Sequence, residues 1–308
     1  MRSALDGNRR RDDALASVLR VTATDEDFQK SVWRSDGTRW GTPVLGAIAG
    51  DIIGSVYEFS RVRTRDFALF GPSSKFTDDS VLTFAVARAI LDAQAGGTAS
   101  PDYRGRILEF GRSYPGRGYG GMFRRWLQAT DPRPYNSFGN GSAMRASPVG
   151  FAFDDELTVL EQARLSAIPT HDHPEGVKGA RAIALATLLA RRREDKEQIR
   201  MRIRYEFLYD LDRTVEEIRP AYTFDETCQG SVPEAIVAFL DSTDFESAIR
   251  NAVWLGGDAD TQACIAGAIA DAAYGVPPEI EREVRKRLPP ALLAILDEFD
   301  ELAPVHAR

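Results

Sequence analysis

The spacing of apolar residues constrains this chain of 308 residues to a helical fold. From Val44 onward, long segments with apolar residues at helical spacing recur between stretches rich in Gly, Pro and Asp. Almost none of these segments shows the alternation of apolar and polar residues that a half-buried strand needs. The sequence therefore predicts an all-α fold. Helices are expected over residues 78–93, 156–168, 175–192, 232–239, 245–253, 259–274 and 278–288, with a further helix after Pro289.

Two segments between the expected helices, 112–121 and 131–141, are rich in Gly, Pro and aromatic residues. Loops of this length in a compact helical domain are often functional, so we expect both to take part in binding. The aromatic side chains in and near them would either stack on a base or pack in the core, and we favour packing. These side chains are Tyr114, Tyr119, Phe123, Trp126 and Tyr135.

The first 40 residues differ from the rest of the chain. They are rich in Arg, Asp, Ser and Thr, and only residues 13–21 show helical spacing of apolar residues. We interpret residues 1–40 as an N-terminal extension and residues 41–308 as one domain. The start of the chain also lacks the apolar run of a signal peptide, which favours a cytoplasmic protein.

Composition excludes several classes of partner and site. The net charge of −7 offers no overall basic field, so no nucleic-acid partner is expected. No apolar stretch reaches the ~18 residues of a membrane span, so we expect no membrane crossing. The only two cysteines, Cys228 and Cys264, are too few for a disulfide framework or a four-cysteine zinc site, and we expect both to be inert core residues.

Acidic clusters open two of the expected helices. One residue is enough to cap a helix, whereas several neighbouring carboxylates repel one another unless a cation neutralises them. Carboxylate and hydroxyl oxygens suit Mg²⁺, Mn²⁺ or Ca²⁺, and two ions would balance four carboxylates. Capping remains the alternative for either cluster alone. The candidate metal ligands are Thr77, Asp78 and Asp79 in the first cluster and Asp258, Asp260 and Thr261 in the second.

Three further features have both a functional and a structural interpretation. Asp51 and Glu58 lie seven residues apart, which would place them on one face if the segment is helical, so Glu58 is a candidate site residue. The glycine-rich segment 138–143 either offers backbone N–H groups to a diphosphate or forms an ordinary turn. Arg145 either pairs with phosphate or binds a carbonyl at a helix end, and we favour the latter.

His171 and His173 form a His-x-His pair. Such a pair could bind a transition metal, but no third nitrogen ligand lies nearby in the sequence. Pro174 indicates a helix start, which explains His173 more simply.

Five short segments form distinctive motifs between residues 44 and 275. They are GDIIGSVYE from Gly50, FTDDS from Phe76, SFGNGSAMRASPVG from Ser137, THDHPEG from Thr170 and GGDADTQACIAGAIADAAYG from Gly256. In content and order they resemble the ADP-ribosylglycohydrolase family. That family includes the dinitrogenase reductase-activating glycohydrolase and the eukaryotic ADP-ribosyl-acceptor hydrolases.

The resemblance implies a compact multi-helix domain with two Mg²⁺ or Mn²⁺ ions at the base of a cleft. It implies hydrolysis of the N- or O-glycosidic bond that joins ADP-ribose to an acceptor. By the same resemblance, the two acidic clusters are the metal-binding segments and Glu58 is a gating or metal-proximal acid. Three carboxylates are candidates for the catalytic proton acceptor, namely Asp79, Asp258 and Glu58.

The resemblance also implies which residues bind substrate. A loop that holds the phosphates and the distal ribose corresponds to Ser137, Phe138, Gly139 and Asn140, and His171 lies where the family has a residue near the diphosphate. Phe138 replaces a Tyr of some relatives, which removes a hydroxyl but keeps the aromatic face. Ala259 replaces a hydroxyl residue that is not a ligand, so we expect the metal site to be retained.

Two functions follow as hypotheses. The first is an ADP-ribosyl-arginine hydrolase of the N-glycosidase class, which removes ADP-ribose from a modified protein. The second is an immunity protein that binds and blocks an ADP-ribosyltransferase toxin through residues 1–40, with or without hydrolysis. Charged and aromatic residues in this extension, such as Arg9, Arg10, Phe28 and Trp33, suit docking into a partner, whereas a simple packing extension is the alternative.

Overall fold

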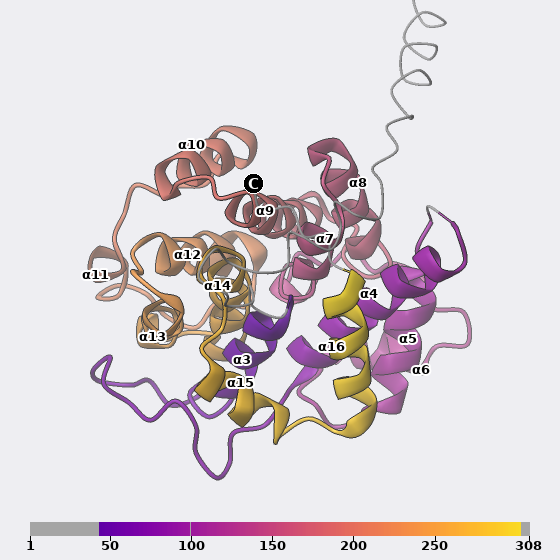
Figure 1. Ribbon diagram of the computed structural model, residues 1–308, viewed down its shortest axis with the longest axis horizontal. Coiled ribbons are helices and arrows are strands. Elements are labelled where there is room, and N and C mark those ends of the chain that lie inside the picture. The colour runs from indigo at the N-terminus through magenta and orange to yellow at the C-terminus, as the bar shows by residue number, and fades with distance from the viewer. Residues whose placement is uncertain (1–42, 99, 303–308) are drawn as a thin grey trace, which may run out of the picture. The chain divides into compact units, whose positions relative to one another are not determined.

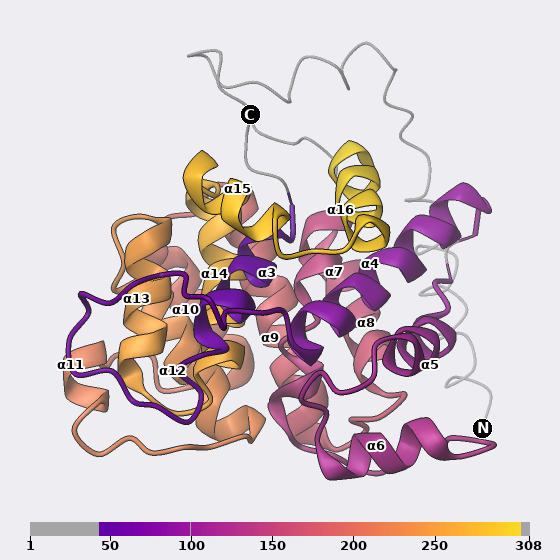
Figure 2. The same ribbon diagram turned by 90° about the horizontal axis from the view of Figure 1, so that it is seen from below.

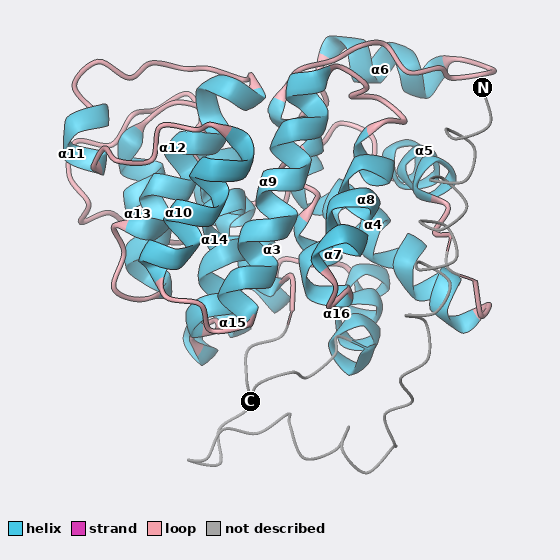
Figure 3. Ribbon diagram, turned by 90° about the horizontal axis from the view of Figure 1, so that it is seen from above, coloured by secondary structure: helices cyan, strands magenta, loops and turns pink. Residues whose placement is uncertain are grey.

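The computed structural model describes residues 43–98 and 100–302. In these two ranges all regular elements are helices, and the extended segments form only one isolated bridge, between Gly139 and Thr227 (Figure 3). The predicted all-α fold is therefore confirmed. Residues 1–40 lie outside the described ranges, so the extension, its boundary and its toxin-binding role stay predictions.

The helices follow one another along the chain, and the longest connection is the loop 55–77 between α3 and α4 (Figure 1). Their bounds are α3 Leu45–Gly54, α4 Asp78–Ala95, α5 Tyr103–Ser113, α6 Gly121–Gln128, η1 Asn140–Ser142, α7 Ser147–Ala152, α8 Glu156–Ala167, α9 Pro174–Arg191, α10 Lys196–Phe207, α11 Val215–Ile218, α12 Cys228–Leu240, α13 Phe245–Leu255, α14 Ala259–Tyr274, α15 Pro278–Arg285 and α16 Pro290–Leu302.

All eight predicted helices are present, as α4, α8, α9 and α12 to α16. The largest difference at a start is in α12, which begins at Cys228 because the Thr227 side chain caps it by accepting a hydrogen bond from the Gly230 N–H. The prediction omits α3, α5, α6 and α10 among the longer helices. Three glycines lower the intrinsic helix propensity of α3, and charged residues hide the narrow apolar face of α10.

Helix α14 forms the centre of the core. Every residue from Ala259 to Ala272 is buried, and the helix packs against α3, α9, α12 and α13 (Figure 2). Cys264 of α14 and Cys228 of α12 are both buried and unpaired, as expected for core residues. No helix in the described part of the chain is long and apolar enough to cross a membrane.

Helices α3 and α14 touch through their backbones. Gly46, Gly50 and Gly54 recur every four residues on α3, and a Cβ atom at any of them would overlap backbone atoms of α14. Their missing side chains allow the two helices to approach closely. The Asp271 carboxylate of α14 also accepts a hydrogen bond from the Gly46 N–H (2.9 Å), which satisfies a free donor at the start of α3.

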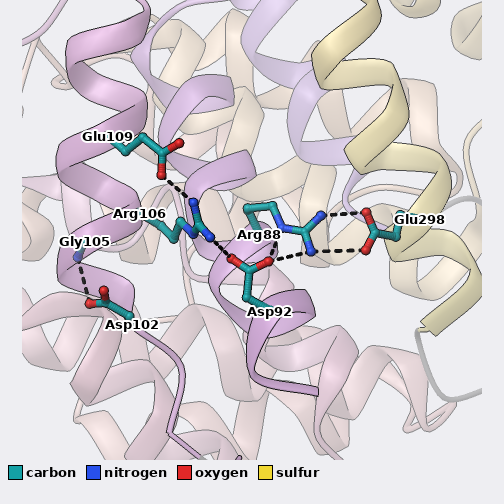
Figure 4. A network of polar contacts seen from close by, with 7 residues as sticks. All are labelled: Arg88, Asp92, Asp102, Gly105, Arg106, Glu109 and Glu298. Atoms are coloured by element: carbon teal, nitrogen blue, oxygen red, sulfur yellow. Dashed lines mark hydrogen bonds and ion pairs between the residues drawn. The ribbon is translucent and has the colours of Figure 1, made fainter. Parts of the chain in front are cut away.

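A network of charged side chains joins α4, α5 and α16 on the outside of the core (Figure 4). Arg88 of α4 binds Asp92 of the same helix and Glu298 of α16, each at 2.6 Å. Arg106 of α5 pairs with Asp92 and Glu109, each at 2.5 Å. These pairs are partly exposed, so each contributes at most about 1 kcal/mol and mainly orients the three helices.

We expect Gly50→Ala to lower the free energy of unfolding by roughly 1–3 kcal/mol or more, because the new methyl group would overlap the Ala263 backbone and force α3 away from α14. Urea unfolding followed by circular dichroism measures the loss. Gly71→Ala is the matched control, since a Cβ there meets no atom within 4 Å. Equal losses in the two variants would contradict this account of the helix contact.

Candidate metal centre and substrate loop

The two acidic clusters meet at the starts of α4 and α14. Thr77 caps α4, where its hydroxyl accepts a hydrogen bond from the Asp79 N–H (3.4 Å). Asp258 occupies the capping position of α14, but its side chain makes no capping bond. Capping therefore explains Thr77, whereas it leaves the gathered carboxylates unexplained.

Two groups of three carboxylates lie within the described residues, and in each group the oxygen atoms are all within 4.8 Å of one another. The first group is Asp51, Asp79 and Asp260, and the second is Glu58, Asp258 and Asp260. Asp260 belongs to both groups, and only Glu58 is not fully buried. We call these five residues the carboxylate cluster. Two adjoining groups of oxygen ligands suit a pair of hard divalent cations.

The electrostatics of the cluster also favour a cation. Burial, followed by repulsion from neighbouring carboxylates, raises the pKa of Asp79 and of Asp260 well above the ordinary value. The same two causes raise the pKa of Asp78 to about 8 and that of Glu58 to about 7. Protons or a bound cation would therefore relieve the repulsion in the cluster.

Hydrogen bonding distinguishes two buried aspartates of the cluster. Asp51 accepts bonds from the N–H and hydroxyl of Thr77 (2.9 and 2.6 Å) and from the N–H and hydroxyl of Ser80. It thereby holds the start of α4. Asp79, by contrast, has a buried oxygen, Oδ1, with no hydrogen-bond donor. An unpaired buried carboxylate oxygen is costly, and a bound cation would satisfy it, so the residues present fit a metal centre.

The structure brings together Asp79, Asp258 and Asp260 as predicted, and it adds Asp51, which the sequence analysis does not include among the site residues. The segment from Asp51 to Glu58 is not one helix, because α3 ends at Gly54, so the two acids do not share a helical face. Glu58 instead reaches the cluster from the following turn. Because Asp51 lies in α3 and Glu58 lies beyond its end, their sequence spacing could not predict that both reach the cluster.

Two threonines and one aspartate among the candidate ligands lie beside these groups. Thr77 donates its hydroxyl proton to Asp51, and the Thr261 N–H donates to Asp260 (3.0 Å). The Asp78 N–H donates to the Arg117 carbonyl (2.8 Å), and Asp78 is in neither group of three. The ligand roles of these residues remain predictions.

Asn140 connects the predicted substrate loop to the carboxylate cluster. Its side-chain amide donates to Asp258 (2.7 Å) and to the Ser231 hydroxyl (3.2 Å). Asp258 is therefore positioned by the loop as well as by its own helix. This contact lets a ligand held at the loop influence the orientation of one carboxylate at the centre.

The backbone of the substrate loop is tied to the segment before α12. The Gly139 N–H donates to the Ser137 hydroxyl (3.2 Å), and the Asn140 N–H donates to the Glu226 carbonyl (2.8 Å). These two N–H groups are thus already paired within the protein. This pairing favours the ordinary turn for these two N–H groups, and the role of Gly139 and Asn140 in substrate binding stays a prediction.

His171 lies buried beside this loop, and its Nε2 atom would be 3.3 Å from a Cβ placed on Gly141. Its Nδ1 atom lies 2.7 Å from the Thr170 hydroxyl. Arg145, which is fully buried, donates to that same hydroxyl (2.8 Å) and to the Ser166 carbonyl (3.0 Å). The structural role predicted for Arg145 at a helix end is confirmed.

We expect this arrangement to favour one neutral form of the His171 ring. The Thr170 oxygen accepts from Arg145, and its single proton can go to Nδ1 of His171 or to the Tyr135 hydroxyl, which Thr170 also contacts. Burial, followed by the Arg145 charge, lowers the pKa of His171 well below its ordinary value. The ring is therefore neutral, and we expect its proton on Nε2, where it would be a donor toward the loop.

The other rings near the loops mostly serve packing. Phe138 is 44% exposed and lies 5.3 Å from the His173 ring, so its face is accessible. His173 caps α9 by accepting from the Glu175 N–H (3.1 Å), as expected for a helix start. The core residues among the aromatic candidates are Tyr119, Phe123 and Trp126, while Tyr114 and Tyr135 are partly buried against them.

The carboxylate cluster predicts an unusual pH dependence of stability. A raised pKa means that the folded protein binds more protons than the unfolded chain, so the cluster favours folding below about pH 4 and loses that contribution as pH rises through about 7 for Glu58 and about 8 for Asp78. Without metal, Tm should fall over this window. Mg²⁺ or Mn²⁺ should raise Tm at pH 8 by roughly 5 °C or more, measured by scanning calorimetry.

Asp79→Asn tests the same point with little change of shape. The variant removes one repelling charge, so its metal-free Tm at pH 8 should exceed that of the wild type, while its gain on adding metal should be lost. Asp66→Asn, at an exposed position, is the control and should behave as the wild type. A metal-free Tm at pH 8 that is lower in Asp79→Asn would contradict the repulsion argument.

Thr170→Val removes the hydroxyl that lies between Arg145 and the Nδ1 atom of His171. The His171 ring should then no longer be restricted to one neutral tautomer. We expect ¹⁵N NMR to show one neutral tautomer, protonated at Nε2, in the wild type and a mixture in the variant. Thr187→Val is the matched control, because it also removes a buried hydroxyl, which bonds only to the Ile183 carbonyl (2.8 Å). A wild-type ring protonated at Nδ1 would refute the assignment.

Comparisons with known proteins indicate one family. The family model of the ADP-ribosylglycohydrolases matches residues 43–307. The ADP-ribosylhydrolase ARH3 of Homo sapiens is 27% identical, over 76% of this chain and 84% of that protein. The ADP-ribosyl-[dinitrogen reductase] glycohydrolase of Rhodospirillum rubrum is 27% identical, over 82% of this chain and 94% of that protein.

A solved structure described as an ADP-ribosylglycohydrolase-related protein complex superposes with a TM-score of 0.63 at 26% identity, over 85% of this chain and 95% of that one. The helical fold agrees with that solved structure. The resemblance seen in the five motifs is thereby confirmed. The chain belongs to the ADP-ribosylglycohydrolase family.

Proposed function

We propose that this protein is a metal-dependent hydrolase that cleaves the glycosidic bond between ADP-ribose and an arginine side chain of a modified protein. Membership in the family supports ADP-ribose hydrolysis. The observation that carries the proposal is the buried carboxylate cluster, in which two groups of three acids share Asp260 and one oxygen of Asp79 lacks a donor.

The candidate ligands would hold two Mg²⁺ or Mn²⁺ ions, which supply positive charge that activates water and orients the ribose hydroxyls. Hydrolysis adds water across the C1''–N bond, because the water oxygen bonds to C1'' and the leaving nitrogen gains a proton. A carboxylate must take the proton from the water. Asp79, Asp258 and Glu58 are the candidates, and Asp258 is oriented for this by the Asn140 amide.

The ADP portion of the substrate is assigned to the loop side of the cluster. The His171 Nε2–H is a neutral donor toward the loop, which suits a phosphate oxygen without adding a buried charge. The exposed face of Phe138 offers stacking to the adenine. With the adenine held by Phe138 and the diphosphate held by His171, the C1'' atom of the distal ribose would lie at the carboxylates. The residues proposed to bind this portion are Ser137, Phe138, Gly139, Asn140 and His171.

Release of ADP-ribose from an ADP-ribosyl-arginine protein tests the proposal. With Mg²⁺ or Mn²⁺ the wild type should release it, and EDTA should stop the reaction. The double variant Asp78→Ala/Asp79→Ala should reduce release to background, because it removes two proposed ligands from one helix start. Asp66→Ala, at an exposed aspartate, should keep wild-type activity. A folded, metal-loaded wild type that releases nothing would overturn the arginine assignment.

A further inference from the structure

A pocket of about 440 Å³ opens beside the carboxylate cluster. Glu58 belongs to both, and Gly257 of the pocket wall directly precedes Asp258 of the cluster. None of the substrate-loop residues lines this pocket. Its walls come from the turn after α3, the loop between α11 and α12 and the turn before α14, through Tyr57, Glu58, Phe59, Arg61, Tyr222, Thr223, Phe224, Gly256 and Gly257.

Two exposed phenylalanines form one wall of the pocket. Phe59 is 85% exposed and Phe224 is 48% exposed, yet their rings stack on each other with centroids 6.1 Å apart and planes 23° apart. They come from different loops, so their pairing at the surface is not a consequence of neighbouring positions in the chain. Adjacent exposed aromatic rings beside a pocket are typical of a binding surface.

The hydroxyls of Tyr57 and Tyr222 and the Arg61 guanidinium, on the other walls, are already engaged, and Tyr57 donates to the Ala68 carbonyl (2.7 Å). The Tyr222 hydroxyl donates to the Gly230 carbonyl (2.8 Å) and accepts from the Gln262 amide (2.7 Å). The Arg61 guanidinium donates to the carbonyls of Arg219 (2.6 Å) and Leu255 (3.1 Å), which braces the pocket.

Among the charged and aromatic groups of the lining, those left to meet a ligand are the ring faces and the Glu58 carboxylate. This combination is suited to a planar cation, because a guanidinium stacks on an aromatic face and donates in its plane to a carboxylate.

We propose that this pocket is the acceptor subsite, where the guanidinium of ADP-ribosyl-arginine stacks on the Phe59–Phe224 pair and donates to Glu58. The inference rests on the proposed function. With the diphosphate held at the substrate loop and C1'' at the carboxylate cluster, the acceptor occupies the remaining opening, which is this pocket. The loops that carry Phe59 and Phe224 then determine which acceptor binds, whereas the carboxylate cluster carries out hydrolysis.

The experiment compares Phe59→Leu/Phe224→Leu with the wild type on ADP-ribosyl-arginine and ADP-ribosyl-serine peptides. Leucine keeps the apolar bulk but removes the aromatic face. The ratio of kcat/KM for arginine over serine should fall about tenfold. Tyr205→Leu, at another exposed aromatic position (83%), is the matched control and should keep the wild-type ratio. An unchanged ratio in the double variant would overturn the proposal.

A binding measurement separates this proposal from the proposed function. Agmatine, a guanidinium compound, is titrated into the wild type with ADP-ribose present, and saturation-transfer NMR reports binding. Butylamine, a cation that is not planar, is the control. Agmatine should bind more tightly than butylamine, and the double variant should lose that preference. If the protein hydrolyses ADP-ribosyl-arginine but does not prefer agmatine to butylamine, the subsite alone is refuted. If it prefers agmatine but does not hydrolyse ADP-ribosyl-arginine, only the proposed function is refuted.

Discussion

The backbone contact between α3 and α14 determines where the acids of this protein lie. Because Gly46, Gly50 and Gly54 carry no side chains, α3 lies directly on the buried central helix. This contact brings Asp51, near the end of α3, next to Asp260, in the first turn of α14. Asp51 in turn binds the start of α4 through Thr77. Three segments that are far apart in sequence thus converge on one site.

The aspartates at this site have different roles. The difference follows from the number of hydrogen-bond donors around each carboxylate. Asp51 is surrounded by four donors from Thr77 and Ser80, so its charge is used to hold a helix start. Asp79 has an oxygen with no donor and faces other carboxylates. Burying such a charge without compensation destabilises the fold, and a functional site tolerates that cost because the ligand relieves it.

The two sides of the cluster are built differently. On the loop side, a chain of bonds from Arg145 through Thr170 to His171 is buried and held by α8. On the pocket side, the aromatic rings of Phe59 and Phe224 stand on exposed loops. Loops tolerate sequence change better than packed helices do. A shared hydrolytic centre can therefore be combined with different acceptor surfaces.

Much of the fold was predictable because its signals are local. Apolar periodicity identified eight helices, and the acids Asp78, Asp79, Asp258 and Asp260 identified two helix starts as a candidate metal site. Helix α3 was missed because glycine weakens a helix in isolation, and only its contact with α14 offsets that weakness. Helix α10 was missed because ion pairs and capping, not a broad apolar face, accompany it.

The sequence by itself determined the helical class, the family and most of the candidate ligands, since these depend on periodicity and on short motifs. Only the tertiary structure decided that Asp51 joins the cluster, that Glu58 reaches it from beyond a helix end, and that His171 is buried beside the substrate loop. It also placed Phe59 beside Phe224, 165 positions later in the chain. Each of these depends on distances between segments, which helix packing sets and local sequence does not encode.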